Sequence, residues 1–283
     1  MKWTEEPGAH VGAIVDSHAH VWTLAAPAYP WRPSFGIVPS DPALPDELLA
    51  AMDDLAIVRA ILVQPSVYGS DHSFLFDTVR RHPDRFSPLG LVDPALPTSR
   101  ELAEDLVGKG CVGLRVNLAL DLRQARRQAD AGSWALLGSL GVPICLRATP
   151  AHHGLATRIV ERQPSTRFMI DHLGLPEPGQ TERTIERLGA LAGFDNCILK
   201  IAGLAGASTG RSPYRDTWPM LAAAHELFGA SRLVWGSDYP AAAPGAGYPD
   251  AVAAMQALPF LSDLERDTVM HGTACDLWGP FDR

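Results

Sequence analysis

The chain has 283 residues, of which 46% are hydrophobic and 20% charged, a composition typical of a globular protein with a sizeable core. It contains no apolar run approaching the roughly 18 residues of a membrane span. It also lacks a basic segment followed by an apolar one at the N-terminus, so we expect a cytoplasmic protein. A formal net charge of -8 argues against nonspecific binding to nucleic acid or to anionic membranes, which needs a basic surface.

Short apolar runs bounded by Gly, Pro and Asp alternate with amphipathic stretches along nearly the whole chain, which is the pattern of βα units. Eight runs predict strands, at 13–20, 58–64, 86–92, 112–117, 143–147, 167–172, 197–201 and 233–238. Helical spacing predicts helices between them, at 46–56, 99–109, 153–163, 181–193 and 217–229, with a final helix near 264–271.

This order predicts an α/β fold with residues 1–283 in a single (β/α)8, or TIM-barrel, domain. Such barrels need about 250 residues, and closing the sheet leaves no edge strand. An open, doubly wound sheet is the alternative. Two long connections, 21–45 and 202–216, follow strands and would lie on the face where barrels form their active sites. In the first of them, Trp22 and Tyr29 are candidates for substrate binding.

Polar residues collect where the predicted strands end. Alternation along the first strand places Ile14, Asp16, His18 and His20 on one face. The other strands end in or near Gln64, Arg115, Asn117, Arg147, His172, Lys200 and Asp238. Catalytic residues of barrels come from these C-terminal ends, so the convergence predicts an active site.

His18, His20, His172 and Asp238 are the candidate catalytic residues and also the candidate metal ligands. Two imidazoles that face one way are costly to bury unless a metal, a carboxylate or a substrate satisfies them. A carboxylate can take a proton from water while imidazoles, or a metal held by them, polarise a carbonyl, so the set indicates hydrolysis. The Gly-x-Ser-x-Gly letters at 206–210 lie within the connection after the seventh predicted strand, and the Gly-x-Gly-x-x-Gly letters at 108–113 lead into a predicted strand instead of into a helix. Neither has the strand–turn–helix context of a serine elbow or a phosphate loop, which argues against serine catalysis and nucleotide use.

Arg115 and Arg147 suit a carboxylate and therefore indicate a small anionic substrate, although pairing with Asp16, Asp93 or Asp171 is the structural alternative for either one alone. Gln64, Asn117 and Lys200 complete the candidate substrate-binding residues. For Gln64 or Lys200 taken singly, a structural role is the stronger interpretation.

Several short motifs, spread in order over nearly the whole chain, carry a family resemblance. They are VDSHAHVW (15–22), YPW (29–31), VQPS (63–66), VGLR (112–115), IDHLG (170–174), LKIAGL (199–204), WGSDYP (235–240) and GTA (272–274). The set resembles the amidohydrolase superfamily, specifically the amidohydrolase-2 branch that contains the sugar-lactone and 2-pyrone-4,6-dicarboxylate lactonases. The resemblance implies a barrel in which the aspartate matching Asp238 activates water for attack on a lactone or amide carbonyl.

The resemblance does not decide whether a metal ion is bound, because some members use a divalent metal whereas in others histidines contact the substrate directly. The fifth strand ends in Arg147 where many metal-dependent members have a histidine, and Arg115 and Asn117 stand where a bridging lysine or glutamate would be. We therefore expect one divalent ion, Zn or Mn, or none, instead of a binuclear centre. His152 or His153 could supply a further ligand or line the pocket.

The leading hypothesis is therefore a hydrolase that opens the lactone of a small carboxylic or sugar acid. The alternatives are a metal-dependent, nonoxidative decarboxylase of an aromatic or unsaturated acid, and a non-catalytic barrel that binds a metabolite. Neither nucleic acid nor a membrane is expected as a partner, and a homo-oligomer remains open.

Overall fold

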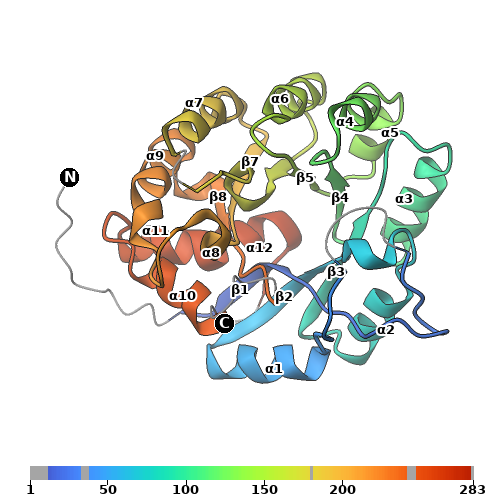
Figure 1. Ribbon diagram of the computed structural model, residues 1–283, viewed down its shortest axis with the longest axis horizontal. Coiled ribbons are helices and arrows are strands. Elements are labelled where there is room, and N and C mark those ends of the chain that lie inside the picture. Colours follow the sequence, from blue (N-terminus) through green and yellow to red (C-terminus); the bar gives the residue numbers. More distant parts are fainter. Residues whose placement is uncertain (1–11, 33–37, 179–180, 241–246, 282–283) are drawn as a thin grey trace.

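The predicted strands form one parallel sheet in the order β1 to β8, with helices around its outside (Figure 1). This computed structural model describes residues 12–32, 38–178, 181–240 and 247–281. The strands are β1 (Ile14–Ala19), β2 (Ile57–Val63), β3 (Phe86–Leu91), β4 (Gly113–Asn117), β5 (Ile144–Arg147), β6 (Phe168–Ile170), β7 (Cys197–Ile201) and β8 (Leu233–Trp235). The prediction of a (β/α)8 barrel is confirmed.

The sheet closes where the ends of β1 and β8 meet. The Asp238 N–H donates to the carbonyl oxygen of His18 at 2.8 Å, and the His20 N–H donates to that of Tyr239 at 2.7 Å. Gly236 makes this approach possible, because a Cβ at that position would lie 2.7 Å from the Cβ of His18. The closure thus brings the first and last strands, and the residues that follow them, into direct contact.

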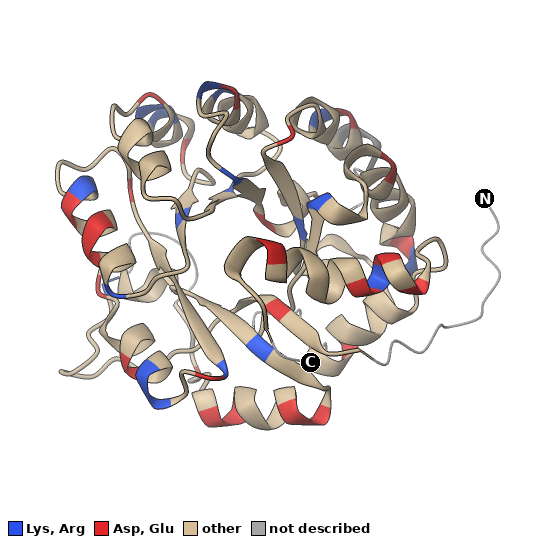
Figure 2. Cartoon of the chain, turned by 180° about the vertical axis from the view of Figure 1, so that it is seen from behind, with Lys and Arg blue, Asp and Glu red and all other residues tan. Residues whose placement is uncertain are grey.

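Twelve α-helices lie within the described residues. They are α1 (Pro45–Asp54), α2 (Ser73–Arg81), α3 (Ser99–Gly108), α4 (Leu122–Ala129), α5 (Trp134–Ser139), α6 (His153–Arg162), α7 (Thr181–Ala192), α8 (Leu204–Ala207), α9 (Trp218–Phe228), α10 (Tyr248–Gln256), α11 (Asp263–Asp267) and α12 (Thr273–Trp278). Side-chain caps stabilise the start of some of these helices. For example, the Asp121 carboxylate accepts hydrogen bonds from the backbone N–H groups of Arg123 and Gln124 in the first turn of α4. In Figure 2, acidic and basic residues are interspersed along the outer helices. None of the described helices combines the length and the apolar character needed to cross a bilayer.

Three boundary predictions are wrong, and the two that concern strands matter for the site. The predicted strands 167–172 and 233–238 end early, at Ile170 and Trp235, so His172 and Asp238 lie beyond the sheet. The predicted last helix, 264–271, is interrupted by a π-helical turn (Thr268–Gly272) between α11 and α12.

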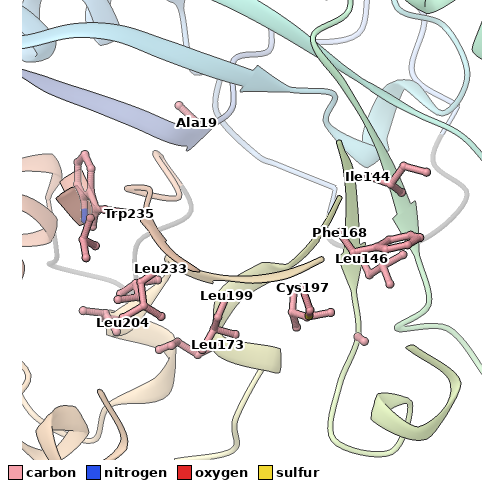
Figure 3. Close-up of a cluster of buried hydrophobic side chains, with 14 of the residues drawn as sticks. Ala19, Ile144, Leu146, Phe168, Leu173, Cys197, Leu199, Leu204, Leu233 and Trp235 are labelled. Carbon is pink, nitrogen blue, oxygen red and sulfur yellow. The ribbon is translucent and has the colours of Figure 1, made fainter. Parts of the chain in front are cut away.

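Two groups of buried hydrophobic residues hold the barrel together. The larger packs the strands against the surrounding helices, and Figure 3 shows part of it, including Phe168, Leu199 and Trp235. The smaller fills the barrel interior, since seven strands contribute to it: Val15, Ile61, Val63, Leu89, Cys145, Met169, Ile198 and Val234. Ala274 and Leu277 of α12 close this interior at one end, and the other end carries the polar residues.

Alternation along β1 does not run as predicted. Ile14 belongs to the outer group and Val15 to the barrel interior. Register shifts against β2 fall between Ile14 and Val15 and again between Asp16 and Ala19. The expectation that Ile14 and Asp16 share a face with His18 and His20 is therefore wrong, because a one-residue slip reverses the direction of the side chains.

Candidate active site

The two histidines of the first βα unit come together as predicted. His18 is fully buried in β1, His20 follows the strand, and their Nε2 atoms stand 3.2 Å apart. His20 Nδ1 lies 2.7 Å from the carbonyl oxygen of Val63. A carbonyl can only accept, so Nδ1 carries the proton and Nε2 presents a lone pair to the site.

His172 reaches the site from a left-handed turn instead of a strand. His172, Leu173, Gly174 and Leu175 have φ angles of 53°, 53°, 72° and 52°. Each non-glycine residue in this region costs about 1–2 kcal/mol, so neighbouring structure must hold the turn. His153, the first residue of α6, lies against it, with Nε2 2.9 Å from the carbonyl oxygen of Gly174. The turn directs the His172 ring to within 4.6 Å of the His18 ring, measured between centroids.

His152 and His153 therefore have structural partners. His153 bonds to the turn that carries His172, and His152 Nδ1 pairs with the hydroxyl of Thr149 at 2.7 Å. Neither belongs to the groups of residues that could hold a metal, nor does either line the main cleft of the described residues.

Asp238 faces all three histidines. Its Oδ1 lies 3.7 Å from His18 Nε2 and 3.8 Å from His20 Nε2, and its Oδ2 lies 3.8 Å from His172 Nδ1. Burial raises the pKa of Asp238 to about 7, although nearby Arg115 favours the carboxylate. The side chain keeps 16% of its surface exposed, so solvent or substrate can reach it.

Gly203, two residues after the end of β7, makes room for this arrangement. A Cβ there would lie 3.0 Å from Asp238 Oδ2 and 3.2 Å from His172 Nδ1, and the φ of +67° also favours glycine. Gly203 was not among the site residues predicted from the sequence. A signal was present in the glycine two residues beyond the end of a predicted strand.

A buried ionic network lies beneath the histidines. Asp171 bonds to Arg115 Nε at 2.9 Å through Oδ2 and to Lys200 Nζ at 3.1 Å through Oδ1. Burial alone would raise the pKa of Asp171, but the two cations hold it well below its usual range. Lys200 Nζ also lies 3.2 Å from His18 Nδ1, and Arg115 Nη2 lies 3.3 Å from His172 Nε2. The alternative that pairs Arg115 with Asp171 is confirmed, and Asp171 is a site residue that the sequence analysis treated only as a partner.

Asp16 ties the two ends of the barrel seam together. Its carboxylate accepts from the Ser237 N–H at 2.9 Å, the Ser237 hydroxyl at 2.5 Å and the Tyr248 hydroxyl at 2.7 Å. It also accepts from the His18 N–H at 2.9 Å. One buried carboxylate thus fixes the backbone on both sides of the site, beside His18 and beside Asp238.

The site can accommodate one metal ion. His18 Nε2, His20 Nε2 and Asp238 Oδ1 are separated by 3.2, 3.7 and 3.8 Å. The centre of such a triangle lies about 2.1 Å from each atom, which matches Zn–N and Zn–O bond lengths. Burial lowers the pKa of His20 to about 3, and it also lowers that of His18, so both rings are neutral as ligands must be.

His172 does not join that group of potential ligands. It forms a second group with His18 and Asp171. Both carboxylate oxygens of Asp171 are already engaged by Lys200 and Arg115, so this second group suits a cation less well. Of the four predicted metal ligands, the structure brings three into one compact set.

A cleft of about 1210 Å³ opens over these residues. Its lining includes Trp22, Arg115 and Arg147 together with His20, His172 and Asp238. Arg147 forms no ion pair with any described residue and makes one long hydrogen bond, 3.4 Å, to Asn117 Oδ1. Its guanidinium is therefore available to a ligand.

The other four predicted substrate-binding residues do not line this cleft. Gln64 is buried and donates to the carbonyl oxygen of Asp71 at 2.7 Å. The Tyr29 hydroxyl donates to Asp77 at 2.7 Å, and Lys200 is completely buried in the ionic network. Asn117 lines a separate cavity of about 400 Å³.

Known proteins resemble this chain along most of its length. The family model described as "Amidohydrolase" matches residues 15–279. A 4-sulfomuconolactone hydrolase of Rhizobium radiobacter is 31% identical over 80% of this chain and 75% of its own length. An L-fucono-1,5-lactonase of Burkholderia multivorans is 26% identical over 93% of this chain and 95% of its own length. A solved amidohydrolase from Burkholderia multivorans with bound Zn has a TM-score of 0.80 at 26% identity, covering 94% of this chain and 99% of that one.

Proposed function

The chain belongs to the Amidohydrolase family, and from that premise we propose that it is a hydrolase that opens the ring of a small, anionic lactone. The observation that carries the proposal is the convergence of Asp238 with His18, His20 and His172 in one cleft. The two curated relatives act on lactones, as their names state. The proposal treats residues 1–283 as a single domain, which the family match over 15–279 supports.

Asp238 is the general base in this proposal. A carboxylate whose pKa is about 7 is partly ionised at neutral pH and can still take a proton from water with a useful driving force. The water oxygen bonds to the lactone carbonyl carbon as its proton passes to Asp238. When the acyl C–O bond breaks, the protonated Asp238 returns that proton to the departing alkoxide, and the products are an alcohol and a carboxylic acid, which releases its remaining proton to solvent and becomes a carboxylate.

His172 stabilises the oxyanion or the leaving oxygen. Arg115 can only donate, so the His172 Nε2 beside it accepts, and the proton resides on Nδ1, which points towards Asp238. A neutral imidazole N–H held in a water-poor site is a preorganised donor for developing negative charge.

His18, His20 and Asp238 would hold the metal if one is bound. A single Zn²⁺ or Mn²⁺ ion at these atoms would supply Lewis-acid polarisation of the carbonyl. In the ion-free site Lys200 Nζ, which can only donate, lies 3.2 Å from His18 Nδ1, so the His18 proton is on Nε2. Ligation through Nε2 would require that proton to move to Nδ1, where Asp171 Oδ1, 3.7 Å away, is the nearby carboxylate oxygen. Zn in the solved relative supports this part of the proposal.

Arg147 and Arg115 bind the anionic group of the substrate. Around the site, Arg115, Arg147 and Lys200 face Asp171 and Asp238, and Asp238 is only partly ionised at neutral pH. An anion in the cleft balances the surplus positive charge, and a guanidinium offers it two parallel hydrogen bonds.

The test is hydrolysis of acidic lactones by the wild-type chain and by Asp238→Asn, with and without chelator, followed by metal analysis. We expect turnover by the wild type and a loss of at least about a thousandfold in the variant, as for removal of a general base. Full activity of Asp238→Asn would overturn the assignment. Release of carbon dioxide without water incorporation would indicate a decarboxylase instead, and saturable binding without turnover would indicate a non-catalytic barrel.

A further inference from the structure

The residues that line the cleft over the site fall into two groups, one charged or titratable and one mainly apolar. Its floor, defined here as His20, Arg115, Arg147, His172 and Asp238, carries the charged and titratable groups. The remaining lining residues, called the wall here, are mainly apolar; besides Ser40, Asp41 and Ser66 they include Trp22, Val38, Pro65, Val67, Leu175 and Pro240. A ligand that lies with its reacting group on the floor must therefore place the rest of its body against apolar surface.

The polar groups at the rim of the cleft are largely engaged with one another. The Ser40 hydroxyl donates to Asp41 Oδ2 at 2.6 Å, and the Trp22 indole N–H donates to the carbonyl oxygen of Asp41 at 2.7 Å. Apart from Ser40, Ser66 carries the one remaining side-chain hydroxyl among the described residues that line the cleft. Selective binding of several substrate hydroxyls requires matching polar partners, and this wall offers few of them.

The geometry points to a substrate whose lactone ring carries an anionic group and an alkyl or aryl body, in preference to a polyhydroxylated sugar lactone. The inference rests on the proposed function and narrows its substrate class. The floor contributes the Arg147 guanidinium, which has one long hydrogen bond and no ion pair among the described residues, for the anion, and the wall contributes the apolar contact.

The size of the cleft agrees with a body larger than one small ring. A volume of about 1210 Å³ matches or exceeds the roughly 300–1,000 Å³ typical of sites for drug-sized ligands. Burying one methylene group against such a wall should raise kcat/KM by up to about fourfold, the ratio that corresponds to its transfer from water. A short alkyl chain therefore has a measurable effect.

The experiment compares acidic γ-lactones that share a carboxylate and differ only in the body. One series carries hydrogen, methyl, propyl or butyl on the ring, and the matched polar compound is an aldaric acid lactone, which keeps the carboxylate but bears hydroxyls. We expect kcat/KM to rise along the alkyl series and to exceed that of the aldaric lactone at least about tenfold, in line with several buried methylenes. An equal or higher value for the aldaric lactone would overturn the inference and leave the proposed function standing. Failure to hydrolyse any of these lactones would overturn both.

A substitution in the wall tests the same point independently. Val38 is 54% exposed, so Val38→Ser removes apolar wall surface without disturbing the core. We expect the butyl-to-hydrogen ratio of kcat/KM to fall at least about twofold, because part of the alkyl contact is lost. Leu264→Ser is the matched control, since Leu264 is 77% exposed and lies outside the cleft, and its ratio should equal that of the wild type. An unchanged ratio in Val38→Ser would contradict the role of this wall.

Discussion

Replacing the proposed general base should make the metal-free protein more stable. Folding raises the pKa of Asp238 from 3.8 to about 7 through burial, so between these values the folded state holds a proton that the unfolded state has released. Stability therefore falls as the pH rises from 4 to 7, and the full cost is present above 7. At 1.36 kcal/mol for each pKa unit, the cost is at most about 4 kcal/mol.

Asp238→Asn removes this cost because an amide does not ionise. The φ of 62° at this position is also one that asparagine tolerates better than most residues. We expect the variant to be more stable than the wild type at pH 8, by about 1–4 kcal/mol, with the difference shrinking towards zero near pH 4. Urea denaturation of chelator-treated protein, followed by circular dichroism at several pH values, measures it.

The matched control is Asp216→Asn, where the sign reverses. Burial would raise the pKa of Asp216, but hydrogen bonds from Ser208 and Thr209 outweigh it and lower the pKa. Asparagine there should leave stability unchanged or reduce it at pH 8. If Asp238→Asn were no more stable than the wild type at pH 8, the argument that burial holds the Asp238 proton would be refuted.

Four further outcomes follow from the site. Gly203→Ala places a Cβ 3.0 Å from Asp238 Oδ2 and should cut kcat at least about tenfold, at a strain cost of about 1–2 kcal/mol; wild-type kcat would contradict the close packing. Arg147→Met should raise KM for acidic lactones about tenfold or more and leave that for neutral lactones unchanged, and an equal rise for both would exclude anion binding by this residue. Asp16→Asn should destabilise the fold by about 2–4 kcal/mol in urea titrations, since four donors lose a shared carboxylate; a loss below about 0.5 kcal/mol would count against the seam contact. Zn²⁺ affinity, measured by competition with a chelating dye, should fall about tenfold for each pH unit below 7, where the ion competes with one proton on Asp238, and a flat profile would show that this carboxylate is not a ligand.

The barrel itself was predictable because its pattern repeats. Eight apolar runs separated by amphipathic stretches specify eight βα units, and the number of units then favours closure. Residues at the ends of such strands converge whatever the detail of each strand, which is why Asp238 and His20 were found in the site even though they lie past the last residues of β8 and β1. The order of the βα units was therefore enough to predict that Asp238 and His20 lie close together.

What the sequence did not reveal depends on local backbone geometry. The left-handed turn that carries His172 includes two leucines, Leu173 and Leu175, which no propensity argument would place at positive φ. The register shifts of β1 reverse the direction of Asp16, and strict alternation cannot anticipate a bulge. The burial of Lys200 beside Asp171 follows from two strands meeting in three dimensions, which spacing along the chain does not record.

The account depends most on Asp238 as the base that activates water for ring opening. The most direct measurement is single-turnover hydrolysis of an acidic, alkyl-bearing γ-lactone in ¹⁸O-labelled water by the wild type and by Asp238→Asn. The account predicts one labelled oxygen in the new carboxylate with the wild type, and a rate at least about a thousandfold lower with the variant. Unchanged turnover by Asp238→Asn, or a product that carries no label, would contradict it.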